Sequence, residues 1–168
     1  RRHARMLTDA LVDVIIFDVT NKVTYRDYYI PLCEAFSEVC QQGTHAPQIA
    51  FLCPFWDPKT TAMELYRDFY EKGLYKDLWF QWEGKPLIMA DPDKVDDEIK
   101  DFFTFRKPVP SYFTGPDGPD QWGWLEVYPQ HVFNNSRGEA EQMTVGVAQN
   151  AVEGRLGSLS EKGAHGRS

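Results

Sequence analysis

The sequence has few cysteines, no excess of positive charge and no long hydrophobic run. Only three of its 168 residues are cysteines, an odd number without the spacing of a metal site. Lysine and arginine number 18 against 25 aspartates and glutamates, and this net charge of −7 argues against a surface for nucleic acid or anionic membranes. No run is long enough for a membrane span, and no signal peptide is visible. We therefore expect no metal, no nucleic-acid partner, no membrane span and three free thiols in buried elements.

The motifs of several large enzyme classes are also absent. No Gly-x-Gly-x-x-Gly follows an expected strand, and the chain has no phosphate-binding loop, Gly-x-Ser-x-Gly or His-Glu-x-x-His. No cysteine has an evident histidine partner. These absences leave a dinucleotide-binding fold unsupported, and we expect no cofactor.

Aromatic residues, by contrast, are abundant. They make up 14% of the chain, with five tryptophans and eight tyrosines. Such an excess is typical of carbohydrate and other ligand clefts, although an aromatic-rich core explains it equally well. A complete α/β barrel needs about 250 residues, and the chain starts at Arg1 without a methionine. We therefore expect a fragment of a larger enzyme.

The central stretch, residues 78–92, sets the expected architecture. Two apolar runs flank the reversal Glu83-Gly84-Lys85-Pro86, in which glycine supplies a positive φ. The second run, Pro86–Ala90, predicts a strand buried on both faces, and it ends on Asp91. A carboxylate at the carboxyl end of a buried strand is where α/β proteins place their chemistry.

Similar patterns before and after this stretch predict alternating helices and strands. A capping box at Thr61 and Glu64 predicts the start of a helix that stops near Gly73. Residues 107–121 read as a long loop. The other expected helices are 1–11, about 25–42 and about 94–101, and the expected strands are 12–17 (buried on both faces), 48–53, 102–106, 122–128 and 143–148.

This alternation predicts a parallel sheet with right-handed crossovers, as either an open doubly wound sheet or a (β/α) barrel. Polar residues follow nearly every expected strand, at Asp18, Asp57, Asp91, Glu126 and Gln149, and would converge on one rim of a barrel. We therefore favour an α/β protein with a partial (β/α) TIM-type barrel over residues 1–150, followed by a Gly- and Ser-rich loop or poorly ordered tail over 151–168.

Two acids stand out as candidate catalytic residues. Asp18 follows the four apolar residues Val14–Phe17, and Glu126 lies between Trp124 and Tyr128 in the expected strand 122–128. Paired carboxylates can cleave a glycosidic bond when one is held protonated. We expect Glu126, among aromatics, to act as the acid and Asp18 to stay ionised. The alternative for both is a purely structural role, since strand-end carboxylates often fix turns or cap helices.

Further residues near the expected strand ends are candidates for binding a sugar. Aromatic rings can stack on sugar faces, and amide or imidazole groups can bind hydroxyls, although core packing, turn formation and simple exposure remain open alternatives for each. Asp91 reads more readily as a turn or cap residue. The candidates are Asn21, Trp56, Asp91, Trp122, Trp124, Tyr128, Gln130, His131 and Asn150.

Three segments resemble one enzyme group. Val14–Asp18, Trp82–Ile88 with its Gly-Lys-Pro, and Met143–Val147 are similar to (β/α)8-barrel glycoside hydrolases related to glycoside hydrolase families 71 and 99. The resemblance extends over roughly residues 3–150 and implies a secreted or periplasmic enzyme. The paired acidic motif of family 99 has no counterpart here, so its catalytic residues are not transferred, and a distinct barrel family acting on bacterial or plant polysaccharide is favoured.

The sequence thus predicts a glycoside hydrolase acting on a poly- or oligosaccharide through Asp18 and Glu126. One alternative is a non-catalytic carbohydrate-binding protein on a degenerate barrel, in which the aromatics matter and the acids do not. Another is a structural fragment without independent function, because a partial barrel leaves sheet edges unpaired.

Overall fold

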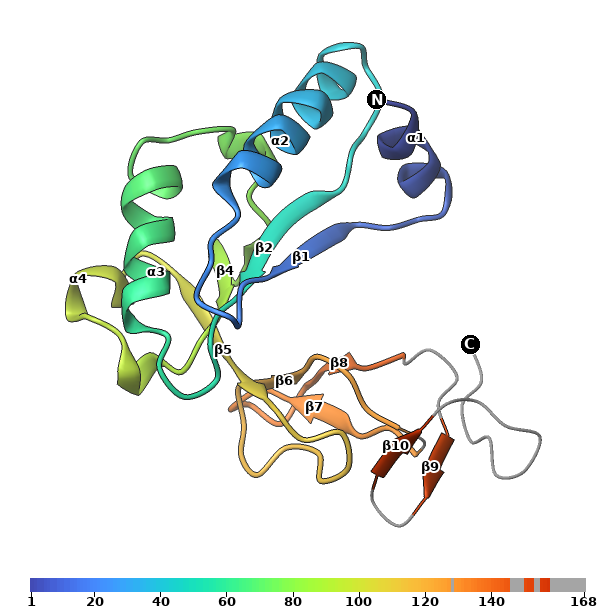
Figure 1. The fold of residues 1–168 in the computed structure, drawn as a ribbon, viewed down its shortest axis with the longest axis vertical. Coiled ribbons are helices and arrows are strands. Elements are labelled where there is room, and N and C mark those ends of the chain that lie inside the picture. Colours follow the sequence, from blue (N-terminus) through green and yellow to red (C-terminus); the bar gives the residue numbers. More distant parts are fainter. Residues whose placement is uncertain (128, 146–149, 153–154, 158–168) are drawn as a thin grey trace. The chain divides into compact units, whose positions relative to one another are not determined.

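A computed structural model of the chain describes residues 1–127, 129–145, 150–152 and 155–157 (Figure 1). The chain divides into two compact units, Arg1–Arg106 and Lys107–Ser168. The first unit combines helices with a mostly parallel sheet, and the second consists of short strands and long connections.

The first unit alternates strands and helices, as the sequence predicts. Neighbouring strands pair in the order β1, β2, β4 and β5, all parallel, and β3 forms an antiparallel hairpin with β4. The expectation of a parallel α/β sheet is confirmed. The elements are α1 (Arg2–Asp9), β1 (Val14–Asp18), α2 (Arg26–Gln41), β2 (Gln48–Leu52), α3 (Lys59–Leu65), the π-helix η1 (Tyr66–Tyr70), the 3₁₀ helix η2 (Lys76–Leu78), β3 (Gln81–Trp82), β4 (Lys85–Met89), the 3₁₀ helix η3 (Pro92–Lys94), α4 (Asp97–Lys100) and β5 (Thr104–Val109).

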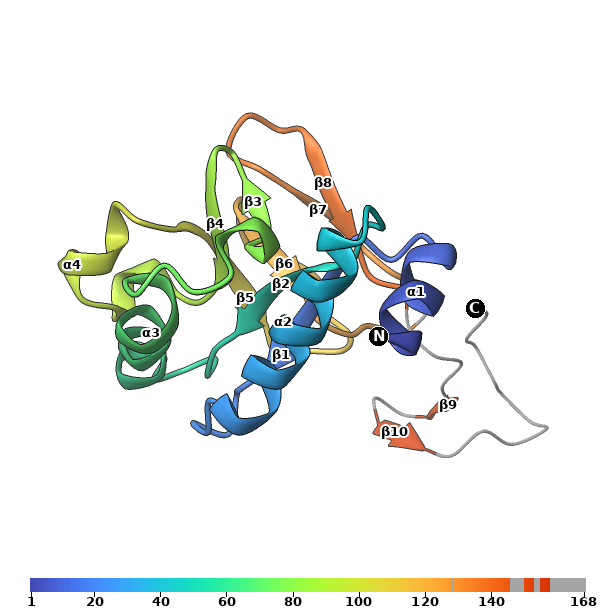
Figure 2. The same ribbon diagram turned by 90° about the horizontal axis from the view of Figure 1, so that it is seen from above.

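The helices of this unit pack against one face of the sheet (Figures 1 and 2). Because side chains alternate along a strand, Ile49, Phe51 and Cys53 join residues of α1, α2, α3, η1 and α4 in a single core cluster. The alternate residues of β2 and β4 point to the opposite face of the sheet. They are buried as well, namely Ala50, Leu52, Leu87 and Met89. The prediction that the strand after the central reversal, β4, is buried on both faces is therefore confirmed, and β2 is buried on both faces as well.

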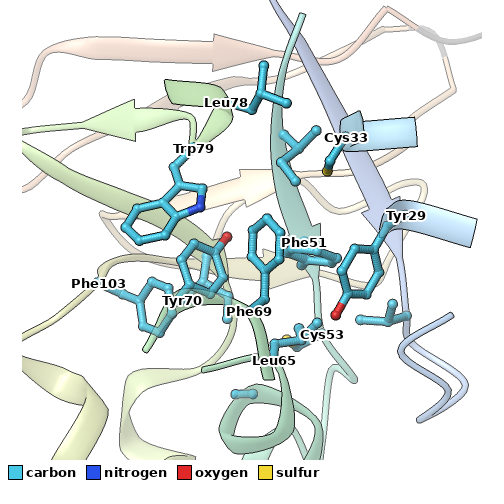
Figure 3. Close-up of a cluster of buried hydrophobic side chains, with 14 of the residues drawn as sticks. Tyr29, Cys33, Phe51, Cys53, Leu65, Phe69, Tyr70, Leu78, Trp79 and Phe103 are labelled. Atoms are coloured by element: carbon cyan, nitrogen blue, oxygen red, sulfur yellow. The ribbon is translucent and has the colours of Figure 1, made fainter. Parts of the chain in front are cut away.

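Aromatic rings fill the helix-covered side of the sheet (Figure 3). Tyr70 packs edge-on against Phe69 and Phe103, with ring centroids 5.1 and 4.8 Å apart. Each such pair adds about 0.5–1.5 kcal/mol beyond the area it buries. Burial raises the pKa of the neighbouring Cys33 thiol to about 12 and also raises the pKa of Cys53. Much of the aromatic excess therefore belongs to the core.

The β3–β4 hairpin shows how the central reversal is built. Glu83 and Gly84 both have positive φ, +52° and +82°. Two successive left-handed residues are the signature of a type I′ turn, whose twist matches that of the flanking strands. Lys85 and Pro86 already belong to β4, where Pro86 faces Gln81 of β3. The predicted reversal is confirmed, with its centre one residue earlier than the glycine alone suggests.

The prediction that the first strand is buried on both faces is wrong. Ile16 of β1 is 38% exposed, and Asp18 is exposed as well. Within the described residues β1 pairs with β2 alone, so it forms an edge of the sheet and is covered less than the central strands.

The capping box at Thr61 is also wrong. The N-cap of helix α3 is Pro58, three residues before Thr61, so the helix begins at Lys59 and Thr61 lies buried inside its first turn. Glu64 instead accepts a hydrogen bond from the Thr24 hydroxyl at 2.6 Å. One cysteine also departs from expectation, because Cys40, near the end of α2, is exposed.

The second unit continues from the end of β5. The segment Lys107–Val109 pairs in parallel with β6 (Gln121–Gly123), and β7 (Val132–Asn134) pairs antiparallel with β8 (Ala140–Met143). Inside the predicted 151–168 tail, β9 (Asn150–Val152) pairs antiparallel with β10 (Arg155–Gly157).

Two strand predictions in this unit fail. The expected strand 122–128 ends at Gly123, which pairs with Val109, the last residue of β5. Glu126 therefore lies in a loop. The expected strand 143–148 shares only Met143 with β8, residues 144 and 145 are not in a strand, and residues 146–148 lie outside the described part of the chain.

Candidate functional site

In the first unit, Asp18 lies at the carboxyl end of the sheet. It is the last residue of β1 and is exposed. Its Oδ1 accepts the backbone N–H of Thr20 at 2.9 Å, which fixes the turn after the strand. Within the described residues, the Asp18 side chain makes no ion pair and no other hydrogen bond. Part of this carboxylate is thus used for structure, and the remainder faces solvent.

The loop after β1 is joined to the loop after β2. Asn21 accepts the Val23 N–H at 3.2 Å and donates its amide to the Tyr25 hydroxyl. Lys22 Nζ lies 2.5 Å from Asp57 Oδ2, and this hydrogen bond and charge lower the pKa of the Asp57 carboxyl. The ion pair therefore links the two loops at the carboxyl end of the sheet.

Trp56 is an exposed aromatic residue at this rim. It precedes Asp57 in the loop after β2, is 72% exposed, and meets Phe55 edge-on at 5.7 Å. Its indole face is accessible to a ligand, in contrast to Trp79, which packs in the core. Of the alternatives left open by the sequence, core packing does not apply to Trp56.

Asp91 follows β4 and is nearly fully buried. Its Oδ1 accepts the Asp93 N–H at 3.1 Å, and Lys94 Nζ lies 3.6 Å from Oδ2. This is the capping geometry that the sequence offered as the alternative to sugar binding. Asp91 therefore has a structural role, in which it fixes the turn after β4.

An ion pair between a buried arginine and an exposed glutamate, which the sequence analysis missed, involves the sheet face opposite the helices. Arg106 of β5 is 3% exposed, and its Nη2 lies 3.1 Å from Glu83 Oε2 in the hairpin turn. The strand register places Arg106 in one row with Met89, Leu52 and Asp18. The sequence does hold a signal for this pair, because the expected strand 102–106 ends in the charged residue Arg106. Alternation along a strand places Arg106 on the face opposite Phe105, where it needs a partner if it is buried.

In the second unit, Glu126 is at the centre of a hydrogen-bonded cluster. Its side chain has 0% exposure. Oε1 lies 2.7 Å from Nδ1 of His131, and Oε2 accepts the His131 backbone N–H at 3.2 Å and the Thr144 hydroxyl at 2.9 Å. The immediate neighbours of this carboxylate are therefore polar donors, whereas the sequence suggested an aromatic setting.

The aromatic candidates of this unit have other partners. Trp122 is buried and donates Nε1–H to Glu141 at 3.0 Å. Trp124 is half-buried, with its ring 5.4 Å from that of Tyr112, and Gln130 is half-buried. Tyr128 and the side chain of Asn150 lie outside the described residues.

The structure thus brings the candidates together in two groups. Asp18, Asn21 and Trp56 occupy the rim of the first unit, while Glu126 and His131 are in direct contact in the second. Across the part of the chain that the structure describes, no three histidine, cysteine or acidic side chains gather as a metal site would require. The helices described there are all too short or too polar to cross a membrane.

No family model matches the chain, and searches of curated proteins and of solved structures found no match. What the structure itself establishes is a mixed α/β protein with a mostly parallel sheet whose carboxyl edge carries an exposed carboxylate and an exposed indole.

Proposed function

We propose that this chain is part of a (β/α) barrel glycoside hydrolase that cleaves a poly- or oligosaccharide at the carboxyl rim of its sheet. The observation that carries the proposal is the exposed carboxylate of Asp18 at the end of β1, on the rim that also presents the indole of Trp56. Active sites of parallel α/β folds lie at this end of the strands.

The barrel part of the proposal is supported by the strand order. Each new parallel strand adds beside the previous one, from β1 to β2, β4, β5 and β6, without reversal. A doubly wound sheet reverses its order and carries helices on both faces, whereas a barrel keeps all helices outside. In the first unit the helices join one cluster on one face, and the opposite face carries Leu52, Met89 and Arg106.

The chemistry proposed for the rim follows from exposure and hydrogen bonding. Oδ1 of Asp18 is tied to Thr20, and the exposed remainder of the group can act as a base or nucleophile toward a bound sugar. Trp56 offers a face on which a pyranose can stack. Glu126 is fully buried and belongs to the second unit, so direct substrate contact in this proposal is assigned to Asp18.

A non-catalytic carbohydrate-binding protein is the second candidate. The observation that favours it is the complete burial of Glu126, because a carboxyl group enclosed by His131 and Thr144 does not reach a glycosidic oxygen. In this alternative Trp56 binds sugar, and Asp18 only fixes the turn after β1.

The two candidates predict different results for the same variants. The full chain is incubated with a panel of plant and bacterial polysaccharides while release of reducing ends and binding are measured. For a hydrolase, Asp18→Asn lowers the rate by about 10²–10⁴-fold, the usual contribution of an acid–base group, while binding is retained. Trp56→Ala weakens binding of the same polysaccharide severalfold.

Asp13→Asn is the matched control, because Asp13 is an exposed aspartate just before the opposite end of β1. Its activity should equal that of the unmodified chain. Binding without hydrolysis, lost in Trp56→Ala and retained in Asp18→Asn, favours the binding protein. Equal hydrolysis by Asp18→Asn and Asp13→Asn contradicts the role given to Asp18.

A further inference from the structure

We propose that Glu126 and His131 form a proton-transfer pair in which Glu126 is a positioning residue and Nε2 of His131 accepts a proton from a hydroxyl group or a water molecule. The pair lies entirely within the second unit. The proposal goes beyond glycoside cleavage at Asp18 and does not depend on it.

Glu126 is built to hold one position. Its carboxylate is fully buried and receives three hydrogen bonds, from the Thr144 hydroxyl and from the backbone N–H and ring Nδ1 of His131. The contact to Nδ1, at 2.7 Å, is the shortest of the three. Because burying a carboxylate is costly unless its oxygens accept hydrogen bonds, these three donors hold the Glu126 side chain in one position.

The orientation of His131 follows from this contact. A carboxylate only accepts hydrogen bonds, so the proton of a neutral His131 ring resides on Nδ1 and Nε2 carries the free lone pair. Among the residues that the structure describes, none bonds Nε2, and the side chain is 41% exposed. The ring thus presents a proton acceptor to solvent while its other nitrogen is fixed.

Gly115 supplies the space that the ring needs. It has φ +64°, and a Cβ at this position would lie 2.5–2.8 Å from three atoms of the His131 ring. The same glycine lines a cavity of about 240 Å³ together with polar side chains, among them Ser111, Thr114 and Asp117. The cavity borders the glycine against which the imidazole packs, and His131 itself is not among its lining residues.

The proposed step moves one proton from the ligand oxygen to His131. Nε2 forms a new N–H bond, the O–H bond of the ligand breaks, and its electron pair stays on the oxygen, which becomes the nucleophile. The ring becomes an imidazolium whose charge is offset by Glu126 at 2.7 Å. Glu126 takes up no proton in this step, so it affects a ligand only through His131.

The first test measures the ring in the unmodified full chain. Imidazole ¹⁵N chemical shifts distinguish a protonated Nδ1 from a protonated Nε2, and we expect the Nδ1–H form for His131. The exposed His3 and His45 serve as internal references. A predominantly Nε2–H ring at His131 overturns the proposal, and this result requires no variant to fold.

The second test measures the reactivity of Nε2. Diethyl pyrocarbonate acylates unprotonated imidazole nitrogens, and the modification rate of each histidine is followed by peptide mass spectrometry. We expect His131 to react faster than His3 and His45, and Glu126→Gln to slow His131 severalfold without changing His3. Thr144→Val, which removes one donor to Glu126 but leaves the ring contact, should have a smaller effect.

Two outcomes of this second test contradict the proposal. A His131 that reacts more slowly than both reference histidines in the unmodified chain shows that Nε2 is not an available acceptor. An unchanged rate in a folded Glu126→Gln variant shows that Glu126 is only a structural partner of His131.

Discussion

At the residue scale, Tyr70 places its hydroxyl group in the apolar core. Its hydroxyl is buried among aromatic rings and has no hydrogen-bond partner within the described chain (Figure 3). An unsatisfied buried hydroxyl costs about 1–3 kcal/mol, whereas the ring itself packs well. Burial correspondingly raises the pKa of Tyr70 well above its usual range.

We therefore predict that Tyr70→Phe leaves stability unchanged or increases it by about 1–2 kcal/mol, because the ring contacts remain and the orphaned hydroxyl is removed. The free energy of unfolding is measured by urea titration. Phe69→Ala in the same cluster is the contrasting variant and should cost about 3–5 kcal/mol. A clear loss of stability in Tyr70→Phe would show that the hydroxyl has a partner.

The candidate residues differ in how far the sequence could predict them. The sequence left two roles open for Asp91, a turn or cap residue and a sugar-binding residue. The structure shows a cap, because its carboxylate accepts the backbone N–H of Asp93, two positions away. Glu126 was assigned a role from its neighbours in sequence, but its contacts include Thr144, eighteen residues away. A sequence pattern can predict a contact between residues two positions apart. It cannot predict a contact across eighteen residues, because only folding brings distant residues together.

At the element scale, the β3–β4 hairpin depends on the backbone of Gly84. A Cβ at this position meets no atom within 4 Å, so any cost of substitution comes from the positive φ of +82°. The hairpin also carries Glu83, the partner of the buried Arg106. A change in turn geometry therefore reaches the sheet face opposite the helices.

We predict that Gly84→Ala destabilises the protein by about 1 kcal/mol, the typical cost of forcing alanine into a left-handed conformation. Thermal and urea unfolding measure this loss. Gly118→Ala is the control, because Gly118 has no positive φ and its nearest neighbour is the Gln121 amide at 3.6 Å, so its effect should stay within about 0.5 kcal/mol. Equal effects of the two substitutions would contradict a type I′ turn.

Strand prediction succeeded where the signal was a continuous apolar run. The runs that became β2 and β4 carry β-branched and aromatic residues that need burial on both faces, and the fold provides it. The run 122–128 alternates aromatics equally well, yet its pairing with β5 stops at Gly123. Whether an apolar segment forms a strand depends on a partner, and the partner is a property of the tertiary structure.

At the scale of the whole molecule, surface ion pairs and hydrogen bonds make stability depend on acid. Hydrogen bonds from Lys22, Lys100 and Asn135 lower the pKa of Asp57, Asp97 and Glu139. A carboxyl group whose pKa is lower in the folded state contributes stability above its unfolded pKa and loses it as pH falls through the folded pKa. The ordinary values are 3.8 for aspartate and 4.5 for glutamate.

We therefore predict that the free energy of unfolding is steady above about pH 5 and declines progressively below about pH 4.5. Urea titrations at pH 7, 4 and 3 measure this decline. Because all three carboxylates are exposed, about 1 M salt should reduce the part that depends on charge, since the screening length is then about 3 Å. A stability that increases between pH 5 and pH 3 would contradict this account.

The sequence by itself determined the local features of this protein. Apolar runs defined the central strands, the 3.6-residue period defined α2, and Gly84 located the hairpin, because each depends on neighbouring residues only. The tertiary structure alone decided that β1 is an edge, that Arg106 pairs with Glu83, and that Glu126 is buried against His131. These features depend on which distant segments pack together, since burial and hydrogen bonding are set by neighbours in space.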